Sequence, residues 1–340
     1  MGASAFNYVQ YGKEDKTTHG TSVAATKRWP GTWNKLPIDK KKSKVEEMMD
    51  VRAASRRTRV DSVLVRDSLV SPNATFQQLP ALFGCSLKGD VTASEVTMGE
   101  GDYLWALSPG MTSSLNAPDS LTIEKGNTED GECREIEYCM FDKIKISGSL
   151  DQEGVENPVS VEANYFGRQL TDVSKTGALA QPSGTFMNAL KARLYIDTSW
   201  AGVGGTEISN LLRSFDIEIL SGLSPDFTGG SNEYFNSHIE SIIGVMGTFT
   251  IKGGSQAWSI FDAARSAGLI VARLEITGPI IGAGTAHSLK IDFSGDYMDV
   301  SPLDSDNRGQ QDATFAIDGL YDTTGAKLLQ VNVVTNSNAY

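Results

Sequence analysis

Strand-like alternation is the feature that most constrains what this chain can fold into. It is clearest in residues 133–150, CREIEYCMFDKIKISGSL, where apolar residues such as Ile144 and Ile146 alternate with charged ones. Successive side chains of a strand point to opposite faces, so a period of two predicts a half-buried strand. Residues 159–167, VSVEANYFG, predict its partner, and the Gly- and Pro-containing stretch between them predicts a hairpin connection.

The same pattern recurs along most of the chain. Further strands are predicted at residues 60–65, 91–99, 102–109, 120–126, 190–196, 213–220, 248–253, 269–278, 288–300, 313–319 and 326–334. Many short strands separated by glycine-containing turns are typical of a β-sandwich or a barrel. With 40% hydrophobic residues, the chain can also bury a sizeable core.

One strongly amphipathic helix is predicted at residues 255–267, with Trp258 and Phe261 on its core-facing side. A shorter helix is predicted at 77–87, although Pro80 falls within it. The fold class is therefore mainly β, a β-sandwich or split barrel with a flanking α-helix.

The 340 residues suit one large or two medium domains. We expect an N-terminal arm or linker at 1–60, a first β-sandwich unit at 61–180 and a second β unit at 181–340. Residues 141–150 and 215–225 echo each other, since both contain Phe-Asp, alternating Ile and Ser-Gly. Two copies of one unit would explain the echo, and so would the general similarity of amphipathic strands.

The charge is unevenly distributed along the sequence. Residues 1–66 hold 14 of the 30 Lys and Arg and 7 of the 42 Asp and Glu, a net charge of +7, whereas residues 67–340 carry –19. A body this acidic should repel nucleic acid. The basic N-terminal region needs a separate explanation.

Residues 1–60 are expected to contact another subunit rather than their own core, because glycines and prolines break any periodicity there and two tryptophans stand in a polar stretch. A solvated charged face and a nucleic-acid site are the alternatives. The candidate contact residues are Trp29, Trp33, Lys40, Lys41, Lys42, Arg56 and Arg57.

No motif for catalysis, cofactor binding or metal binding stands out. The chain lacks a G-x-S-x-G elbow and a phosphate-binding P-loop, and its three cysteines match no zinc spacing, which favours buried structural thiols. The aspartates of residues 295–312 depart from the calcium-loop spacing and favour an acidic solvated loop. We therefore expect no enzyme, no cofactor and no metal. No run of eighteen apolar residues occurs, so no membrane-spanning helix is expected.

The order of several segments resembles the major tail tube proteins of long-tailed, non-contractile bacteriophages. The segments are Tyr11–Glu14 with His19–Thr26, Pro80–Gly89, Ser120–Gly126, Phe141–Leu150 with Val159–Arg168, and Ala326–Asn336. The likeness spans most of the chain, and its motifs are structural rather than catalytic.

This resemblance implies a virion protein, made in the cytoplasm of a bacterial host, that self-assembles into stacked rings. Rings of three or six chains would form the hollow tail tube that conducts the genome, and DNA would pass through without specific binding. The tail terminator, distal tail and tape-measure proteins would be partners. Long members of this family carry two units in each chain, so that three chains make a ring.

One expectation belongs to the tube hypothesis. The channel-facing strands should be rich in Asp, Glu, Ser and Thr and poor in Lys and Arg, with candidates around residues 143–149 and 159–164. The alternatives are another virion structural protein, for example a capsid or decoration component, and a carbohydrate-binding β-sandwich with a cleft lined by aromatic residues.

Overall fold

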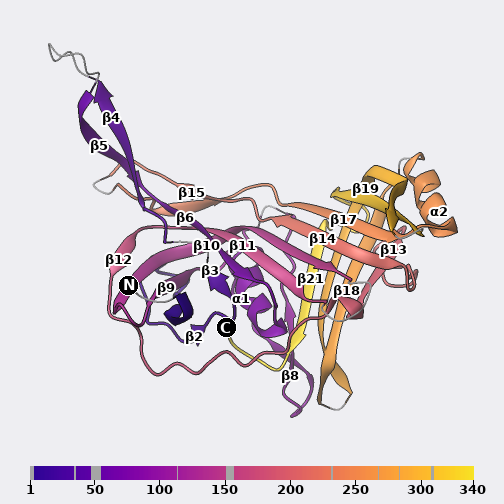
Figure 1. Ribbon diagram of the computed structural model, residues 1–340, viewed down its shortest axis with the longest axis horizontal. Coiled ribbons are helices and arrows are strands. Elements are labelled where there is room, and N and C mark those ends of the chain that lie inside the picture. Colours follow the sequence, from indigo (N-terminus) through magenta and orange to yellow (C-terminus); the bar gives the residue numbers. More distant parts are fainter. Residues whose placement is uncertain are drawn as a thin grey trace.

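The fold is seen in a computed structural model that describes residues 4–33, 36–46, 55–112, 114–150, 157–230, 233–266, 268–282, 284–307 and 310–340 (Figure 1). Strands account for 54% of the residues and helices for 8%, which confirms a mainly β fold. The core is continuous across the molecule and gathers alternate residues from most of the strands.

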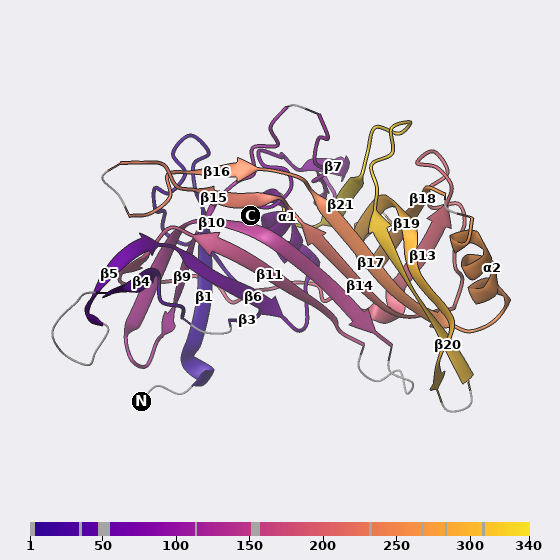
Figure 2. The same ribbon diagram turned by 90° about the horizontal axis from the view of Figure 1, so that it is seen from above.

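Eight strands form one continuous antiparallel row, which we call the long sheet (Figure 2). In spatial order they are β3 (Thr32–Trp33), β6 (Val65–Ser71), β11 (Val159–Gly167), β10 (Glu132–Ser149), β14 (Leu212–Leu220), β17 (Gly244–Lys252), β20 (Gln310–Gly319) and β19 (Thr285–Asn307). The strands predicted for β11, β10, β14, β17, β20 and β19 are confirmed, although the structure shifts or extends most of their ends, whereas β3 and β6 were not predicted.

Two long strands of this row, β10 and β19, also form the second layers of the fold. The first part of β10 pairs with β9 and β12, and β9 pairs with β1, which is joined by β2. The first part of β19 pairs with β18 and β21, which pair in turn with β13 and β8, and β7 joins β8. These strands are β1 (Asn7–Lys13), β2 (Lys27–Arg28), β7 (Ser94–Thr97), β8 (Asp102–Ala106), β9 (Leu121–Asn127), β12 (Leu170–Asp172), β13 (Ala192–Asp197), β18 (Ile270–Gly282) and β21 (Leu329–Thr335).

Two separate hairpins leave the long sheet. The first, β4 (Lys40–Glu46) with β5 (Ser55–Val63), lies between β3 and β6 in the chain, and the second, β15 (Leu223–Asp226) with β16 (Ser237–Glu240), lies between β14 and β17. Figure 1 shows β4–β5 projecting away from the body, whereas β15 runs along it.

The connectivity of the chain is repeated. In the first copy β1 pairs with β9, β3 with β6, β6 with β11, β11 with β10, and β10 with β9 and β12. The second copy makes the same six antiparallel pairings with β13, β18, β14, β17, β20, β19 and β21. Each copy also places a hairpin before, and a helix after, its second sheet strand. One pairing, β10 with β14, joins the two copies within the long sheet.

The sequence echo does not mark this repeat. Residues 141–150 lie on β10 and residues 215–225 include most of β14, and these strands are neighbours rather than equivalents. They run antiparallel, with Ile144 opposite Ile219 and Ile146 opposite Ile217. Both segments alternate in the same way because each buries one face in the core.

Two α-helices follow the equivalent strands β6 and β17. Helix α1 (Leu79–Gly84), entered through the 3₁₀ turn η2 (Phe76–Gln78), confirms the shorter predicted helix and is buried along its whole length. Helix α2 (Ser255–Ala264) confirms the longer one but ends earlier. Its buried residues are Ala257 and Ile260, whereas Trp258 is 47% exposed and only meets the ring of Phe261 edge-on, so the prediction that Trp258 is a core residue is wrong.

The N-terminal region is not an arm that avoids its own core. Strand β1 pairs along its whole length with β9, and Val9 and Tyr11 belong to the core. Trp29 is 5% exposed, and its indole nitrogen donates to the carbonyl oxygen of Val70 at 3.4 Å. Hydrophobic burial within this chain therefore holds Trp29, and the prediction that it contacts another subunit is wrong.

The basic residues of the same region occupy the β4–β5 hairpin. Lys40, Lys41 and Lys42 are exposed on β4, and Arg57 is exposed on β5. The backbone of Trp33 pairs with Leu69, but its side chain and that of Arg56 lie outside the described part of the chain. The contact predicted for this cluster stays a prediction.

Candidate functional surface on the long sheet

One face of the long sheet is apolar and forms the core, and the opposite face, which we call the polar face, carries hydroxyl and charged side chains. Its residues follow from the alternating burial and the strand register. They include Arg66 and Ser68 on β6, Ser160, Glu162 and Asn164 on β11, Lys143, Lys145 and Ser147 on β10, Ser214, Asp216 and Glu218 on β14, Thr248, Thr250 and Lys252 on β17, Asp312, Thr314 and Asp318 on β20, and Asp296, Asp299 and Ser301 on β19.

The polar face is acidic, with seven carboxylates and four cations among these residues. Three of the four cations form ion pairs: Lys143 with Glu218 at 2.7 Å, Lys145 with Asp216 at 2.7 Å, and Arg66 with Asp142 at 2.9 Å. The hydrogen bond to Asp216 raises the pKa of Lys145. Most of the positive charge on this face is therefore neutralised locally, and the negative charge that remains lies largely on β19 and β20 and at Glu162.

Hydroxyl groups form a second band across the same face. Ser147 and Ser160 hydroxyls lie 2.8 Å apart on β10 and β11, and Thr250 and Thr314 hydroxyls lie 3.1 Å apart on β17 and β20. Each pair bridges two neighbouring strands through hydroxyl groups rather than through charges, and β14 lies between the two pairs.

The sequence identified only part of this face. The candidate segments 143–149 and 159–164 do contribute to it, but two of their residues are lysines, against the expected scarcity of Lys. Most of the carboxylates come from β14, β19 and β20. Which strands would lie beside β10 could not be read from the sequence, because a pairing such as Lys145 with Asp216 joins residues 71 positions apart.

Both ends of the long sheet have unfilled edges among the described residues. Strand β18 pairs with β19 only as far as Gly295, so beyond that point β19 has β20 on one side and no strand on the other. At the opposite end, β3 pairs with β6 and has no described strand on its outer side. Unpaired backbone groups at sheet edges favour pairing with another chain.

A buried hydrogen-bond chain near the start of the sequence resembles catalytic machinery but does not have its geometry. Ser120 donates to Glu14 at 2.5 Å and lies 2.7 Å from Nδ1 of His19. Ser120 is fully buried, so no substrate reaches its hydroxyl, and that hydroxyl donates its proton to Glu14 rather than to the histidine. Glu14 also accepts hydrogen bonds from the backbone NH groups of Gly20 and Tyr138. These hydrogen bonds hold the loop after β1 in place.

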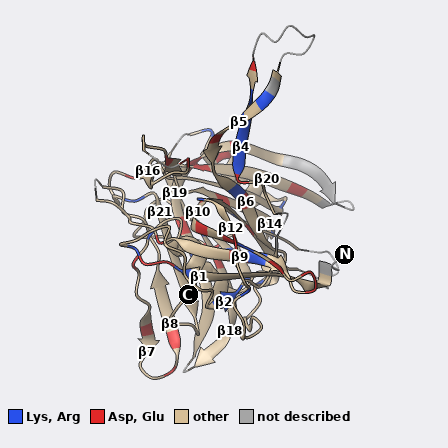
Figure 3. Cartoon of the chain, turned by 90° about the vertical axis from the view of Figure 1, so that its left-hand side faces the viewer, with Lys and Arg blue, Asp and Glu red and all other residues tan. Residues whose placement is uncertain are grey.

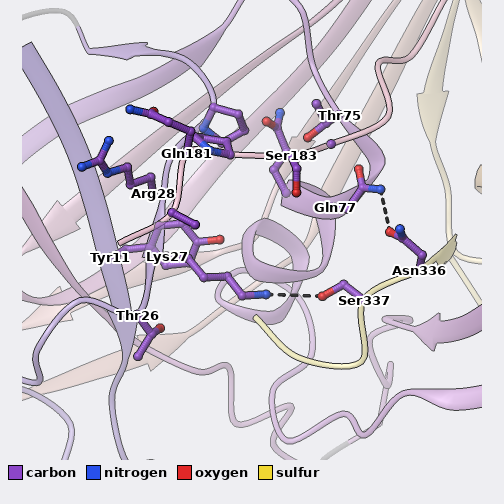
Figure 4. A pocket seen from close by; sticks show the side chains of 15 residues that line it. Tyr11, Thr26, Lys27, Arg28, Thr75, Gln77, Gln181, Ser183, Asn336 and Ser337 are labelled. Carbon is purple, nitrogen blue, oxygen red and sulfur yellow. Dashed lines mark hydrogen bonds between the residues drawn. The ribbon is translucent and has the colours of Figure 1, made fainter. Parts of the chain in front are cut away.

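A cavity of about 360 Å³ lies between β2, η2, residues 180–184 and the C-terminal tail (Figure 4). Lys27 donates to the hydroxyl of Ser337 at 3.3 Å, and Gln77 donates to Asn336 at 2.8 Å. These bonds tie the C-terminal tail to segments from the first copy. The lining is polar and could hold a small polar group, but Lys27 and Gln77 already hydrogen-bond the C-terminal tail.

Among the described residues, no group of acidic, histidine and cysteine side chains is placed to hold a metal ion, and no helix is long and apolar enough to cross a membrane. Cys85, Cys133 and Cys139 are buried and unpaired, as predicted, and burial raises the pKa of each thiol.

Comparison with known proteins identifies no related family: no family model matches the chain, and no curated protein is detectably similar to it.

Proposed function

We propose that this chain is the subunit of a hollow tube that conducts DNA, the role implied by its resemblance to bacteriophage tail tube proteins. The observation that carries the proposal is the β10–β14 junction. It joins the last sheet strand of one copy of the repeat to the first sheet strand of the next. At the ends of the long sheet, β19 is the equivalent of β10 and β3 is the equivalent of β14, and each has one side without a neighbouring strand among the described residues. Two copies of the chain can therefore join through β19 and β3 as its two halves join through β10 and β14.

The register of the internal junction specifies the external one. Strands β10 and β19 carry the same bulge, between Phe141 and Lys143 and between Tyr297 and Asp299. Lys143 is therefore equivalent to Asp299. Within the chain Lys143 lies opposite Leu220.

The equivalent of Leu220 on the other edge follows from β3. Trp33 pairs with Leu69 as Phe215 pairs with Phe249, and Ile38 stands five positions after Trp33 in the sequence, as Leu220 does after Phe215. Asp299 of one copy would then face Ile38 of the next. Ile38 is 83% exposed. Exposing so large an apolar side chain to water is unfavourable unless another molecule covers it.

Closing the row of strands into a ring would turn one face of the long sheet toward a channel. The polar face suits that position because it carries many hydroxyl groups and because Lys143, Lys145 and Arg66 are each paired with a carboxylate. Phosphates would find few free counter-charges there, so DNA would slide without adhering. Among the residues named for the polar face none is aromatic, whereas a carbohydrate-binding surface would use aromatic side chains for stacking.

Two copies of the unit in each chain favour a ring of three chains, six units in all. Such rings would stack into the tube, in a virion assembled in a bacterial cytoplasm, with terminator, distal tail and tape-measure proteins as the partners at its ends and inside it.

The test is electron microscopy of the purified protein at increasing concentration, combined with native mass measurement. The proposal expects closed rings with the mass of three chains and hollow tubes built from them. A protein that stays monomeric and folded at every concentration would contradict it.

A further inference from the structure

The β15–β16 hairpin lies across the first copy of the repeat and is held there by apolar contacts. Leu223 and Phe235 are buried in a small cluster with Met140, Phe166 and Tyr138. The ring centroid of Phe235 is 5.6 Å from that of Phe166 and 5.0 Å from that of Tyr138. Met140 and Phe166 lie opposite each other on β10 and β11 and form a platform under the hairpin.

The same hairpin reaches as far as the base of the other one. The backbone NH of Val63, at the end of β5, donates to the carbonyl oxygen of Glu233 at 2.8 Å. The Nδ1 of His238 lies 3.1 Å from the hydroxyl of Tyr138, and the carboxylate of Glu240 accepts from the backbone of Asn116 and Ala117. A hairpin at this position of the repeat is therefore built to cover the neighbouring copy.

Apart from the bond at Val63, the described residues of the equivalent hairpin, β4–β5, pack on no other element of their own chain. Figures 1 and 3 show it standing clear of the body, with basic residues along it. Its described segments hold seven Lys and Arg against two acidic residues, a net charge of +5. Lys40, Lys41, Lys42 and Lys44 are all exposed.

The platform that would receive this hairpin differs from the first one in one respect. Counting back one residue from the shared bulge, Met140 is equivalent to Asp296, and its cross-strand partner Phe166 is equivalent to Asp318. An apolar pair in the first copy is thus an acidic pair in the second. Asp318 is exposed, and no described Lys or Arg lies within ion-pairing distance of either carboxylate.

We propose that the β4–β5 hairpin of one chain lies across Asp296 and Asp318 of an adjacent chain, as β15–β16 lies across Met140 and Phe166 within the chain. The inference rests on the proposed self-assembly and names its contact. Each hairpin matches its platform: apolar on apolar inside the chain, basic on acidic between chains. Charged surfaces keep the free subunit soluble, whereas an exposed apolar hairpin would promote aggregation. Opposite charges on the two surfaces also speed the encounter between copies.

The contact can be tested by charge reversal in the full-length chain. One variant carries Lys41→Glu and Lys42→Glu, a second carries Asp296→Lys and Asp318→Lys, and a third carries all four changes. We expect each of the first two to weaken ring formation by roughly tenfold or more near physiological salt, because like charges then face each other, and the third to restore most of it. The readout is the ring population from native mass measurement over a concentration series.

A matched control changes an acidic pair elsewhere, with Glu95→Lys and Glu100→Lys near the ends of β7 and β8, and should leave the ring population within about twofold of wild type. Thermal melting confirms that every variant is folded, since all the altered residues lie at the surface. Rings that persist in the second variant, or that the third fails to restore, would overturn this contact while leaving the tube subunit intact. A wild-type chain that never forms rings would overturn both.

Discussion

The two hairpins of the repeat occupy the same place in the connectivity and have opposite chemistry. The hairpin β15–β16 buries Leu223 and Phe235 against its own chain, whereas β4–β5 exposes a row of lysines to solvent. Their platforms differ in the same sense, Met140 with Phe166 in one copy and Asp296 with Asp318 in the other. In the proposed assembly the first contact is permanent, because it is built like a protein core, and the second forms only between chains and depends on salt.

The largest effect is expected from the buried ion pair of the first copy. Lys125 and Asp67 lie 2.6 Å apart with side chains 0% and 2% exposed. Lys125→Met leaves the Asp67 carboxylate buried without its partner and should lower the free energy of unfolding by about 3–5 kcal/mol. The corresponding loss for Arg273→Met, which leaves Asp292 in the second copy, should be smaller because the Arg273 side chain is 18% exposed.

Urea denaturation provides the measurement for both variants. Adding Asp67→Leu to Lys125→Met should recover most of the loss, because the pair is then replaced by apolar groups. If the double variant is no more stable than Lys125→Met, the cost does not come from an unpaired charge.

The packing of the β15–β16 hairpin on the first copy of the repeat should depend on Phe235. Phe235→Ala removes a fully buried ring from the Met140 and Phe166 platform and should cost about 3 kcal/mol in urea unfolding. The control Phe227→Ala, at a residue 46% exposed on the same hairpin region, should cost less than about 1 kcal/mol. Equal effects from the two variants would show that β15–β16 is not held by its platform.

Acid should loosen the docked hairpin selectively. Burial lowers the pKa of His19 and, with a smaller contribution from His19, that of His238. A lowered pKa means that the fold favours the neutral imidazole, so this contribution to stability is complete above about pH 6.5 and is lost as the pH falls through the lower folded-state pKa. The free energy of unfolding should therefore decrease between pH 7.5 and pH 5.

His238→Gln should make that decrease shallower, because a neutral amide replaces the titrating ring beside Tyr138. His287, buried away from this hairpin and also lowered in pKa by burial, provides the control position. Hydrogen exchange of β16 amides should follow the same profile, and exchange that is independent of pH in this range, after correction for the intrinsic rate, would contradict the role of His238.

The smallest effect is expected at the exposed tryptophan of α2. Trp258→Ala should change the free energy of unfolding by less than about 1 kcal/mol, since nearly half of the side chain is already in water. Ile260→Ala on the buried side of the same helix should cost about 2–4 kcal/mol. A larger loss of stability for Trp258→Ala than for Ile260→Ala would show that Trp258 is a core residue after all.

Local patterns predicted the strands because burial of one face imposes a period of two on each of them. Strand β11 begins and ends where VSVEANYFG does, and β14 begins one residue before its prediction. The lysine run of β4 has no such period, because neither of its faces is buried, so only its charge was visible.

Long-range relationships could not be predicted in the same way. The two copies of the repeat share pairings rather than residues, and the only visible echo fell on neighbouring strands. The burial of Trp29 depends on β6, about forty residues away in the sequence. The buried lysine of β9, Lys125, likewise depends on Asp67, which also lies on β6. The acidic platform became apparent only once the register placed Asp296 opposite Asp318.

The central claim, that β19 of one chain pairs beside β3 of the next in the register of the internal junction, is tested most directly by a cysteine pair. In a chain carrying Asp299→Cys and Ile38→Cys, the two new thiols are expected opposite each other between chains, and the three native cysteines are buried. Mild oxidation followed by non-reducing mass analysis should give covalently linked rings of three chains, and Asp299→Cys with Ile242→Cys, an equally exposed partner, should not. A chain that remains monomeric on oxidation, or that links equally well through both pairs, would contradict the account.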